Sequence, residues 1–249
     1  MVTLKNASEI RVMSDACRIS AQALKVAGEY MHPGVSTKEI DEAIRKYIVS
    51  TGAKPNFLGY GGFPASACIS INDEVIHGIP SKKRILHDGD IVSVDVGAFY
   101  NGFNGDNAYT FAVGEISDEA KALLRVTEEC LYKGIEAAKP GNRIGDIGHA
   151  VQSHAESFGY GVVRKFVGHG VGRKLHEDPE VPNFGTAGRG VRLAAGMTLA
   201  IEPMINLVGE DVRVLSDGWT TVTASGSIAA HFEHTVVITN DGAKILTRA

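Results

Sequence analysis

The sequence predicts an α+β fold made of two similar halves, and three observations carry this prediction. Helical apolar periodicity occurs in two pairs of segments, and strand-like apolar runs follow each pair. A Pro-Gly dipeptide separates the helices of each pair, at Pro33-Gly34 and at Pro140-Gly141. A shift of 107 residues superposes the halves in order and places Asp95 on Glu202. Two such units are expected to pack about a pseudo-two-fold axis.

The first half begins with two predicted helices. Residues 8–31 carry a broad apolar stripe, and Ser8 is the expected N-cap of this helix. A second helix, 37–50, is expected to be capped by Ser36 or Thr37. Glycine ends this helix, and a loop rich in glycine and aromatic residues follows before the next strand signal.

A hairpin over residues 91–110 is the strongest strand prediction in the chain. Asn101-Gly102 supplies the dipeptide that favours a type I′ turn. If the turn centres there, Asp95 lies opposite Ala108, and Asp106 is its diagonal neighbour on the same face. Diagonal neighbours lie roughly 7–8 Å apart. The valines of the same strand point the other way, towards a core, so one face of the hairpin presents two acids.

The second half repeats this plan. Helices are expected over 118–138 and 144–158, the second ending near a glycine. The repeat predicts a second pair of acids, and Glu202 and Glu233 both occur in strand-like apolar runs. The loop between these two runs, 207–227, is longer than its counterpart in the first half.

Composition indicates one globular domain in a reducing compartment. The chain has 249 residues, 44% hydrophobic and 22% charged, and a net charge of −4. A net negative charge does not favour binding to DNA or to an anionic membrane. No apolar run is long enough to span a bilayer. Three scattered cysteines argue against a disulfide framework, and the N-terminus lacks a signal-peptide core. We therefore expect a cytoplasmic protein whose single domain, 1–249, contains units of about 8–115 and 116–249.

The four acids raise an electrostatic problem if the repeat brings them together. An acid alone in a strand is most simply a solvated or hydrogen-bonded side chain. However, two like charges 4 Å apart repel by about 4 kcal/mol at an effective dielectric of 20. Converging carboxylates must protonate, separate or bind cations, and two divalent ions would cancel four of them. His169, flanked by glycines, can complete the donor set. Oxygen ligands with one imidazole suit Mn(II), Fe(II), Co(II) or Zn(II) better than a structural zinc site.

Four strings in the same order, NGFNGD, GHGVGRKLHEDP, IEPM and FEHT, resemble those of type I methionine aminopeptidases. The resemblance covers essentially the whole chain. It implies the pita-bread fold, in which helices cover the outer face of a curved, mainly antiparallel sheet. It also implies a dinuclear metal site: Asp95 would chelate one ion, Asp106 and Glu233 would bridge both, and His169 and Glu202 would complete the other. Asn104 stands where relatives often have histidine, at a position that is not a ligand.

The resemblance also implies catalytic roles for residues near these ligands. Two metal ions that share a water lower its pKa and polarise a carbonyl, so amide hydrolysis is the natural reaction. Glu202 would accept a proton from this water. His176 would hydrogen-bond the substrate carbonyl as charge develops on its oxygen. His77 would face the scissile nitrogen or the next residue, although an ordinary loop histidine remains the alternative.

The family match further implies an apolar pocket suited to a flexible thioether. Its candidate lining residues are Tyr60, Phe63, Cys68, Phe166, Leu175 and Trp219. Each aromatic residue could instead belong to the ordinary core. Phe57 and Leu175 depart from some relatives and leave the shape of the pocket open. The other histidines, at positions 32, 87, 149, 154, 231 and 234, are assigned to the surface or to packing.

The leading functional hypothesis is removal of the initiator methionine from nascent chains and peptides with a small second residue. One alternative is an Xaa-Pro aminopeptidase or dipeptidase. Those enzymes carry a further N-terminal domain, for which we expect no room here because the first helix starts by about residue 8. The other alternative is an inactive binding protein of the same fold, which would be expected to lose metal ligands that this chain keeps. Type II relatives carry a large insertion that is not visible here. We expect a monomer with two divalent ions, of which cobalt, manganese, iron and zinc are candidates. A transient ribosome contact through Lys82-Lys83-Arg84 is open, although a solvated loop is the simpler interpretation.

Overall fold

The computed structural model describes residues 2–248 and has mixed α and β architecture. Four α-helices lie in this part of the chain: α1 (Ala7–Gly28), α2 (Thr37–Ser50), α3 (Asp118–Ala137) and α4 (Ile144–Ser157). The strands of the first half are β1 (Lys54–Pro55), β2 (Ala67–Ile71), β3 (Glu74–Ile76), β4 (Ile91–Tyr100) and β5 (Phe103–Ala112), and a short 3₁₀ turn spans Tyr60–Gly62. Those of the second half are β6 (Gly161–Val162), β7 (Gly168–Gly170), β8 (Glu177–Val181), β9 (Thr198–Ile201), β10 (Met204–Asn206), β11 (Val212–Val214), β12 (Thr221–Thr223), β13 (Ala229–His231), β14 (His234–Thr239) and β15 (Gly242–Ile245).

The helices begin where local side chains satisfy their free N–H groups. The Ser36 side chain accepts from the N–H of Glu39, whose carboxylate accepts in turn from the backbone N–H of Ser36, so a capping box starts α2 as predicted. The expected Ser8 cap of α1 is wrong. Asn6 caps this helix and accepts from the N–H groups of Ser8 and Glu9, because its side-chain oxygen precedes the first turn.

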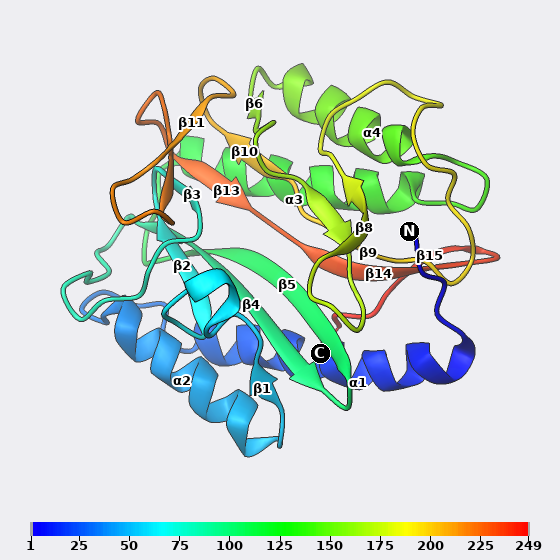
Figure 1. Ribbon diagram of the computed structural model, residues 1–249. Coiled ribbons are helices and arrows are strands. Elements are labelled where there is room, and N and C mark those ends of the chain that lie inside the picture. The colour runs from blue at the N-terminus through cyan, green and yellow to red at the C-terminus, as the bar shows by residue number, and fades with distance from the viewer. Residues whose placement is uncertain (1, 249) are drawn as a thin grey trace.

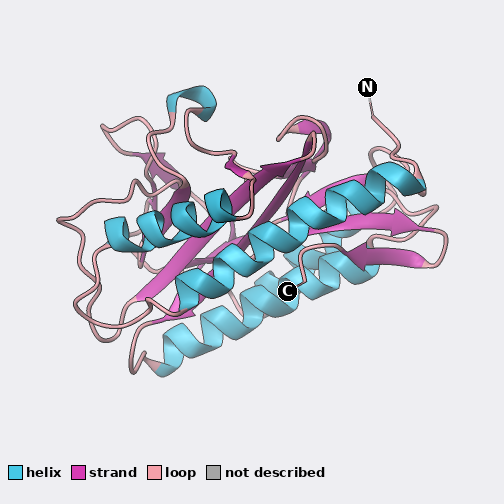
Figure 2. Cartoon of the chain, turned by 90° about the horizontal axis from the view of Figure 1, so that it is seen from below, coloured by secondary structure: helices cyan, strands magenta, loops and turns pink. Residues whose placement is uncertain are grey.

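The helices cover the strands in two pairs, one from each half of the chain, in agreement with the predicted fold class. In Figure 1, α1 and α2 run below the hairpin of β4 and β5, and α3 and α4 lie on the other side of the molecule. Seen from below, in Figure 2, the two nearest helices, α1 and α2, cross in front of the strands. All strand pairs are antiparallel. One apolar cluster joins α1 and α2 to β2 and β4, and a second joins α3 and α4 to β9 and β14. In residues 2–248, no helix is long and apolar enough to cross a membrane.

The two halves share a backbone frame at the predicted offset. Helices α2 and α4 have 14 residues each and begin 107 residues apart. The N–H of Gly34 donates to the carbonyl of Leu86 (2.9 Å), and the N–H of Gly141 donates to that of Leu193 (3.1 Å). Both glycines have positive φ, 93° and 90°, which suits a residue without a side chain. Strands β1 and β6 recur at the same offset, so the pseudo-symmetry extends from the helices into the sheets.

Candidate metal centre

The β4–β5 hairpin places two acids as the sequence predicted. Asp95 pairs with Ala108, and Asp106 pairs with Gly97, so the predicted register is confirmed. Asn101 and Gly102 have φ values of 48° and 84°, the positive values that a type I′ turn requires. The valines on the other face of β4 are buried against α1 and α2. This packing fixes the face on which the acids lie, because a register slip of one residue would bury them in the core.

The second pair of acids stands at breaks in the sheet. The prediction placed Glu202 and Glu233 within strand-like runs, but β9 ends before Glu202 and β13 ends before Glu233. Pro203, directly after Glu202, cannot donate to a ladder, which gives a physical reason for the first break. Ile201 pairs with His234 on one side of the breaks, and β10 resumes the pairing with β13 on the other side. Glu202 and Glu233 therefore face each other across the gap.

Hydrogen bonds join the two halves beside these acids. The N–H of Glu233 donates to the carbonyl of Ala108 on β5 (2.9 Å). The hydroxyl of Thr235 donates to the carbonyl of Asp106 (2.7 Å), and both groups are buried. Asp106 and Glu233 come from different halves of the chain, and these bonds hold their backbones side by side.

His169 supplies a nitrogen donor directed at the acids. Its Nδ1 lies 2.8 Å from the carbonyl oxygen of Gly170, to which a neutral ring donates its proton. This bond leaves the lone pair of Nε2 free, at 3.5 Å from a carboxylate oxygen of Glu202 and 3.8 Å from one of Asp106. Side-chain donor atoms of Asp106, His169 and Glu233 lie within 4.8 Å of one another, close enough to hold a single ion.

Burial makes this group of acids unfavourable in its ionised form. Loss of solvation, together with repulsion from Asp106, raises the pKa of Asp95 well above its usual range. Burial is also the main cause that raises the pKa of Asp106 to about 7, and burial and the neighbouring acids raise those of Glu202 and Glu233 well above theirs. One oxygen of each of Asp95, Asp106 and Glu233 is buried without a hydrogen-bond donor. Oxygens that are buried, close together and unpaired fit the ligand set of hard divalent cations.

Metal-free protein is expected to lose stability as the pH rises from 6.5 to 8.5. The folded-state pKa of Asp106 is raised, so the folded state binds more protons than the unfolded state and stability falls as the pH rises towards and through the folded pKa. Asp106 alone contributes about 1 kcal/mol over this window. Burial lowers the pKa of His169 to about 3. The unfolded chain still releases protons from such histidines just above pH 6.5, which opposes the effect by about 0.4 kcal/mol for each, whereas the raised pKa values of Asp95, Glu202 and Glu233 add to it.

This prediction is checked by thermal melting of chelated protein across the pH window, with and without added Mn(II). The melting temperature should fall with pH in the chelated sample, and Mn(II) should raise it most at pH 8.5. A melting temperature that is independent of both pH and metal would show that the acids are not held together as described.

A cavity of about 220 Å³ opens beside the acids. Its lining includes every residue that the sequence singled out as a ligand, catalytic residue or pocket residue: Asp95, Asp106, His169, Glu202, Glu233, His77, His176, Tyr60, Phe63, Cys68, Phe166, Leu175 and Trp219. Phe57, whose effect on the pocket was open, also lines it. The cavity thus joins a polar end, where the acids meet, to an apolar recess.

Aromatic edges form the walls of the recess. The rings of Phe63 and Trp219 meet edge to face with centroids 5.2 Å apart. Phe63, Cys68 and Leu175 belong to one buried apolar cluster with Phe57, and Trp219 packs against it. Burial raises the pKa of the Cys68 thiol well above its usual range, which keeps this thiol protonated and unreactive.

The two outer histidines lie between the acids and the recess. His77 contacts the edge of Phe166, with centroids 5.6 Å apart. The ring of His176 lies 4.1 Å from that of His169, and its Nδ1 is 2.6 Å from the hydroxyl of Tyr60. Burial lowers the pKa of both outer histidines, that of His77 to about 4. Both rings are therefore neutral at pH 7 and can donate or accept a hydrogen bond without carrying charge.

Sequence reasoning missed the position of His231, which it assigned to the surface or to packing. His231 is 1% exposed, neither ring nitrogen has a hydrogen-bond partner among the described residues, and its Nε2 lies 3.8 Å from a carboxylate oxygen of Glu202. The alternation of side chains could have revealed it, because a residue two positions before Glu233 tends to share its face. His234, next to Glu233, contacts instead the hydroxyl of Thr247, at 2.9 Å from its Nδ1, which agrees with its assignment to packing.

Together, a sheet-borne group of acids, one imidazole and an adjoining apolar recess define the ligand set and pocket of a metal-dependent hydrolase. The sequence matches metallopeptidase family M24 over residues 11–240, and the chain belongs to this family. It is 54% identical over 247 residues to a methionine aminopeptidase of Clostridium acetobutylicum, covering 99% of each protein. The predicted family resemblance is thereby confirmed.

Solved structures agree with this assignment and with the pita-bread fold. The crystal structure of methionine aminopeptidase from Thermotoga maritima matches with a TM-score of 0.98 and 48% identity over 100% of both chains. A prolidase from Pyrococcus horikoshii matches with a TM-score of 0.79 and 26% identity, and the match covers 99% of this chain but only 63% of that one. The fold is therefore shared with Xaa-Pro enzymes, whereas full-length agreement is with methionine aminopeptidases.

Proposed function

We propose that this chain hydrolyses the bond after an N-terminal methionine in peptides and nascent proteins, with preference for a small second residue. The observation that carries the proposal is the composition of the cavity, whose lining combines acidic donors with a recess of aromatic, thiol and aliphatic groups. A thioether side chain packs well against aromatic edges, so the recess suits methionine. The full-length similarity to methionine aminopeptidases supports the same substrate.

The five donors Asp95, Asp106, His169, Glu202 and Glu233 would hold two divalent ions, with Mn(II), Fe(II), Co(II) and Zn(II) as candidates. Four carboxylates can balance the charge of two such ions, and the unpaired buried oxygens support this stoichiometry. When bound, the ions supply a water of lowered pKa and a Lewis acid for the scissile carbonyl.

The chain's own residues would then move protons and orient the substrate. Glu202 would accept the proton of the attacking water, because its carboxylate lines the cavity and lies 3.5 Å from Nε2 of His169, and burial raises its pKa well above its usual range. If the hydroxyl of Tyr60 donates to Nδ1 of His176, the neutral ring carries its proton on Nε2, from which it would donate a hydrogen bond to the developing oxyanion. His77, against Phe166, would contact the scissile nitrogen or the next residue.

A peptide assay tests this function. Purified protein should release methionine from Met-Ala-Ser, lose this activity in a chelator, and recover it with Mn(II) or Co(II). A parallel assay with Xaa-Pro peptides tests the prolidase-like alternative, which the shared fold favours to a lesser degree. Cleavage of Xaa-Pro peptides alone, or metal binding without any turnover, would exclude the proposed function and favour an Xaa-Pro enzyme or an inactive binding protein.

The proposed setting is the cytoplasm, where new chains emerge. All three cysteines are free and buried, which supports a reducing compartment. We propose that residues 1–249 act as one catalytic domain with units of about 8–115 and 116–249, as a monomer. Contact with the ribosome is tested by co-sedimentation of the protein with ribosomes at low and physiological salt.

A further inference from the structure

His77 occupies a backbone conformation that surrounding contacts must maintain. Its φ is +60°, a left-handed value that is uncommon for residues other than glycine, although asparagine, aspartate and histidine adopt it more often than most. Such conformations persist where the rest of the structure over-determines them, and they occur preferentially at functional sites. His77 directly follows β3, so the groups that hold the segment from Glu74 to Ile79 decide where its ring points.

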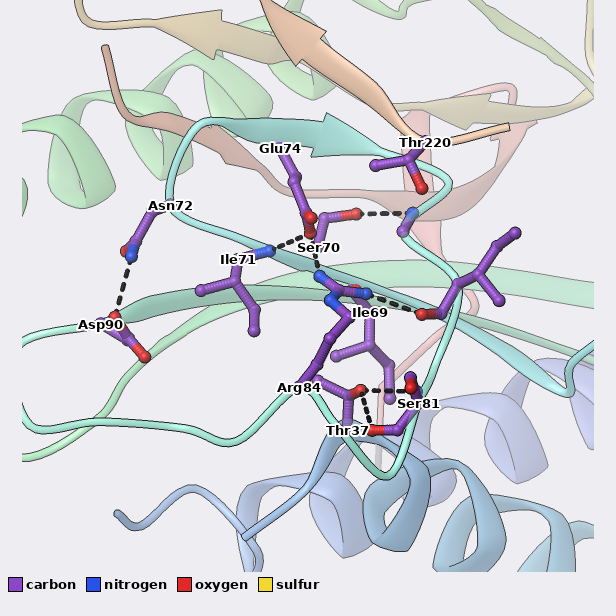
Figure 3. Close-up of polar contacts among 12 residues, drawn as sticks. Thr37, Ile69, Ser70, Ile71, Asn72, Glu74, Ser81, Arg84, Asp90 and Thr220 are labelled. Carbon is purple, nitrogen blue, oxygen red and sulfur yellow. Dashed lines mark hydrogen bonds and ion pairs between the residues drawn. The ribbon is translucent and has the colours of Figure 1, made fainter. Parts of the chain in front are cut away.

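Arg84 holds this segment at both ends (Figure 3). Its Nη1 donates to the carbonyl of Ile79 (2.7 Å), two residues after His77, and to that of Ile69 on β2 (3.1 Å). Its Nη2 forms an ion pair with Glu74, three residues before His77. The side chains of Arg84 and Glu74 are 23% and 17% exposed, so solvent screens this pair less than a surface pair.

Further bonds tie the same segment to β2. The carboxylate of Glu74 also accepts from the N–H of Ile71 (2.7 Å). The N–H of Gly78 donates to the hydroxyl of Ser70 (3.1 Å), and its carbonyl accepts from the N–H of Ile69 (2.9 Å). A Cβ atom on Gly78 would lie 2.3 Å from the carbonyl oxygen of Ile69, so the approach is close enough to require glycine. Strand β2 also carries Cys68 of the recess, so this frame connects His77 to a pocket wall.

The segment meets the second half on its other side. Ile76, the residue before His77, pairs with Thr221 of β12. The turn before β12 presents Trp219, whose ring centroid lies 6.1 Å from that of His77. The position of His77 is thus determined by contacts on two sides. On one side Arg84 bonds to β2, and on the other side β12 places Trp219 beside the histidine ring.

We propose that Arg84 and Glu74 are positioning residues that hold His77 in its orientation towards the cavity. The inference rests on the proposed function, in which His77 contacts the substrate beside the scissile bond. The planar guanidinium can satisfy two carbonyl groups and one carboxylate at fixed angles, which a lysine ammonium cannot do with the same geometry. Arg84 itself is absent from the cavity lining and acts through His77.

The test is a kinetic cycle between Arg84 and His77 with Met-Ala-Ser and saturating Mn(II). Displacement of a substrate-contacting group by 1 Å can cost about 100-fold, so we expect partial loosening in R84M to lower kcat about 10-fold. KM and the bound metal should change little, and R84K should recover part of the loss. In an H77A background, R84M should lower kcat less than about 2-fold, since coupled residues are not additive.

The matched control is R18M, which breaks an exposed ion pair with Asp15 on α1. This variant should leave kcat unchanged. If R84M does not fold, as judged by its melting curve, E74Q serves instead, because glutamine keeps the acceptor and loses the charge. An equal fall in kcat with and without His77, or an unchanged kcat in R84M or E74Q, would overturn the proposal.

A second readout separates this proposal from the proposed function. In metal-free protein, the ring signals of His77 in NMR spectra, assigned with H77A, should shift in R84M or E74Q and stay in place in R18M. Failure of the wild-type protein to release methionine would refute the function, whereas unchanged His77 signals in R84M and E74Q would refute the positioning role even if the wild type is active.

Discussion

Alanine in place of Asp106 is expected to remove methionine release and to lower the metal content of the protein. Asp106 is 3% exposed, one of its oxygens has no hydrogen-bond donor, and it lies among the donor atoms of His169 and Glu233. In the proposed site Asp106 would be shared by both ions, so its loss would weaken the binding of each. Loss of a group that only orients a ligand costs about 10–100-fold in affinity or activity, so loss of the ligand itself should exceed about 100-fold.

The measurements are peptide turnover and metal counted per chain after dialysis. Asp118→Ala is the control, because the side chain of Asp118 is 99% exposed at the start of α3. The metal-free D106A variant should also be more stable than the metal-free wild type at pH 8.5, since it removes one buried repelling charge. Retained activity with unchanged metal content would contradict the assignment of Asp106 as a bridging ligand.

Alanine in place of His176 is expected to reduce kcat by about 10²–10³-fold, the loss typical of one oxyanion-stabilising donor. His176 lies beside the predicted ligands without being one of them: its ring meets that of His169 edge to face, with centroids 4.1 Å apart, and its Nδ1 contacts the hydroxyl of Tyr60. Metal content should therefore stay at the wild-type level. The loss should appear in kcat rather than in KM, because the proposed hydrogen bond strengthens as charge develops on the substrate oxygen.

Steady-state kinetics with Met-Ala-Ser and a metal count check this expectation. His87→Ala is the control, since His87 is a surface histidine with a side chain 77% exposed. A change confined to KM would assign His176 to substrate binding alone. Loss of metal would instead make it part of the ligand set.

The sequence predicted the β4–β5 half of the site in detail because local signals determine it. The Asn101-Gly102 turn sets the register, and the alternation of valines sets the face on which Asp95 and Asp106 lie. The sequence also identified Glu202 and Glu233 through the repeat. It did not predict that their strands break at these residues. Pro203 is a local signal for the first break that the sequence reasoning did not use, whereas the second break arises where Glu233 bonds across to the other half.

Non-local pairing accounts for most of what the sequence did not predict. The pairing of β3 with β12 brings Trp219 beside His77 from a loop more than 100 residues away, and no local periodicity encodes it. The sequence did not indicate the ion pair between Glu74 and Arg84 either, because each residue alone is typical of a solvated loop. The N-cap of α1 was missed for a smaller reason: Asn6 and Ser8 are both good caps, and the geometry of Asn6 is the better one.

The bonds across the halves have a consequence for motion. Glu233 and Thr235 donate to β5, while the hydroxyl of Thr110 on β5 donates to the carbonyl of His231. Hydrogen bonds therefore connect the two repeat units at their boundary. In a two-domain enzyme, this boundary would contain a hinge. The carboxylates of the two halves are thus held in one hydrogen-bonded frame, and we expect substrate to enter by displacement of side chains and exposed segments such as the Tyr60–Gly62 turn rather than by domain closure.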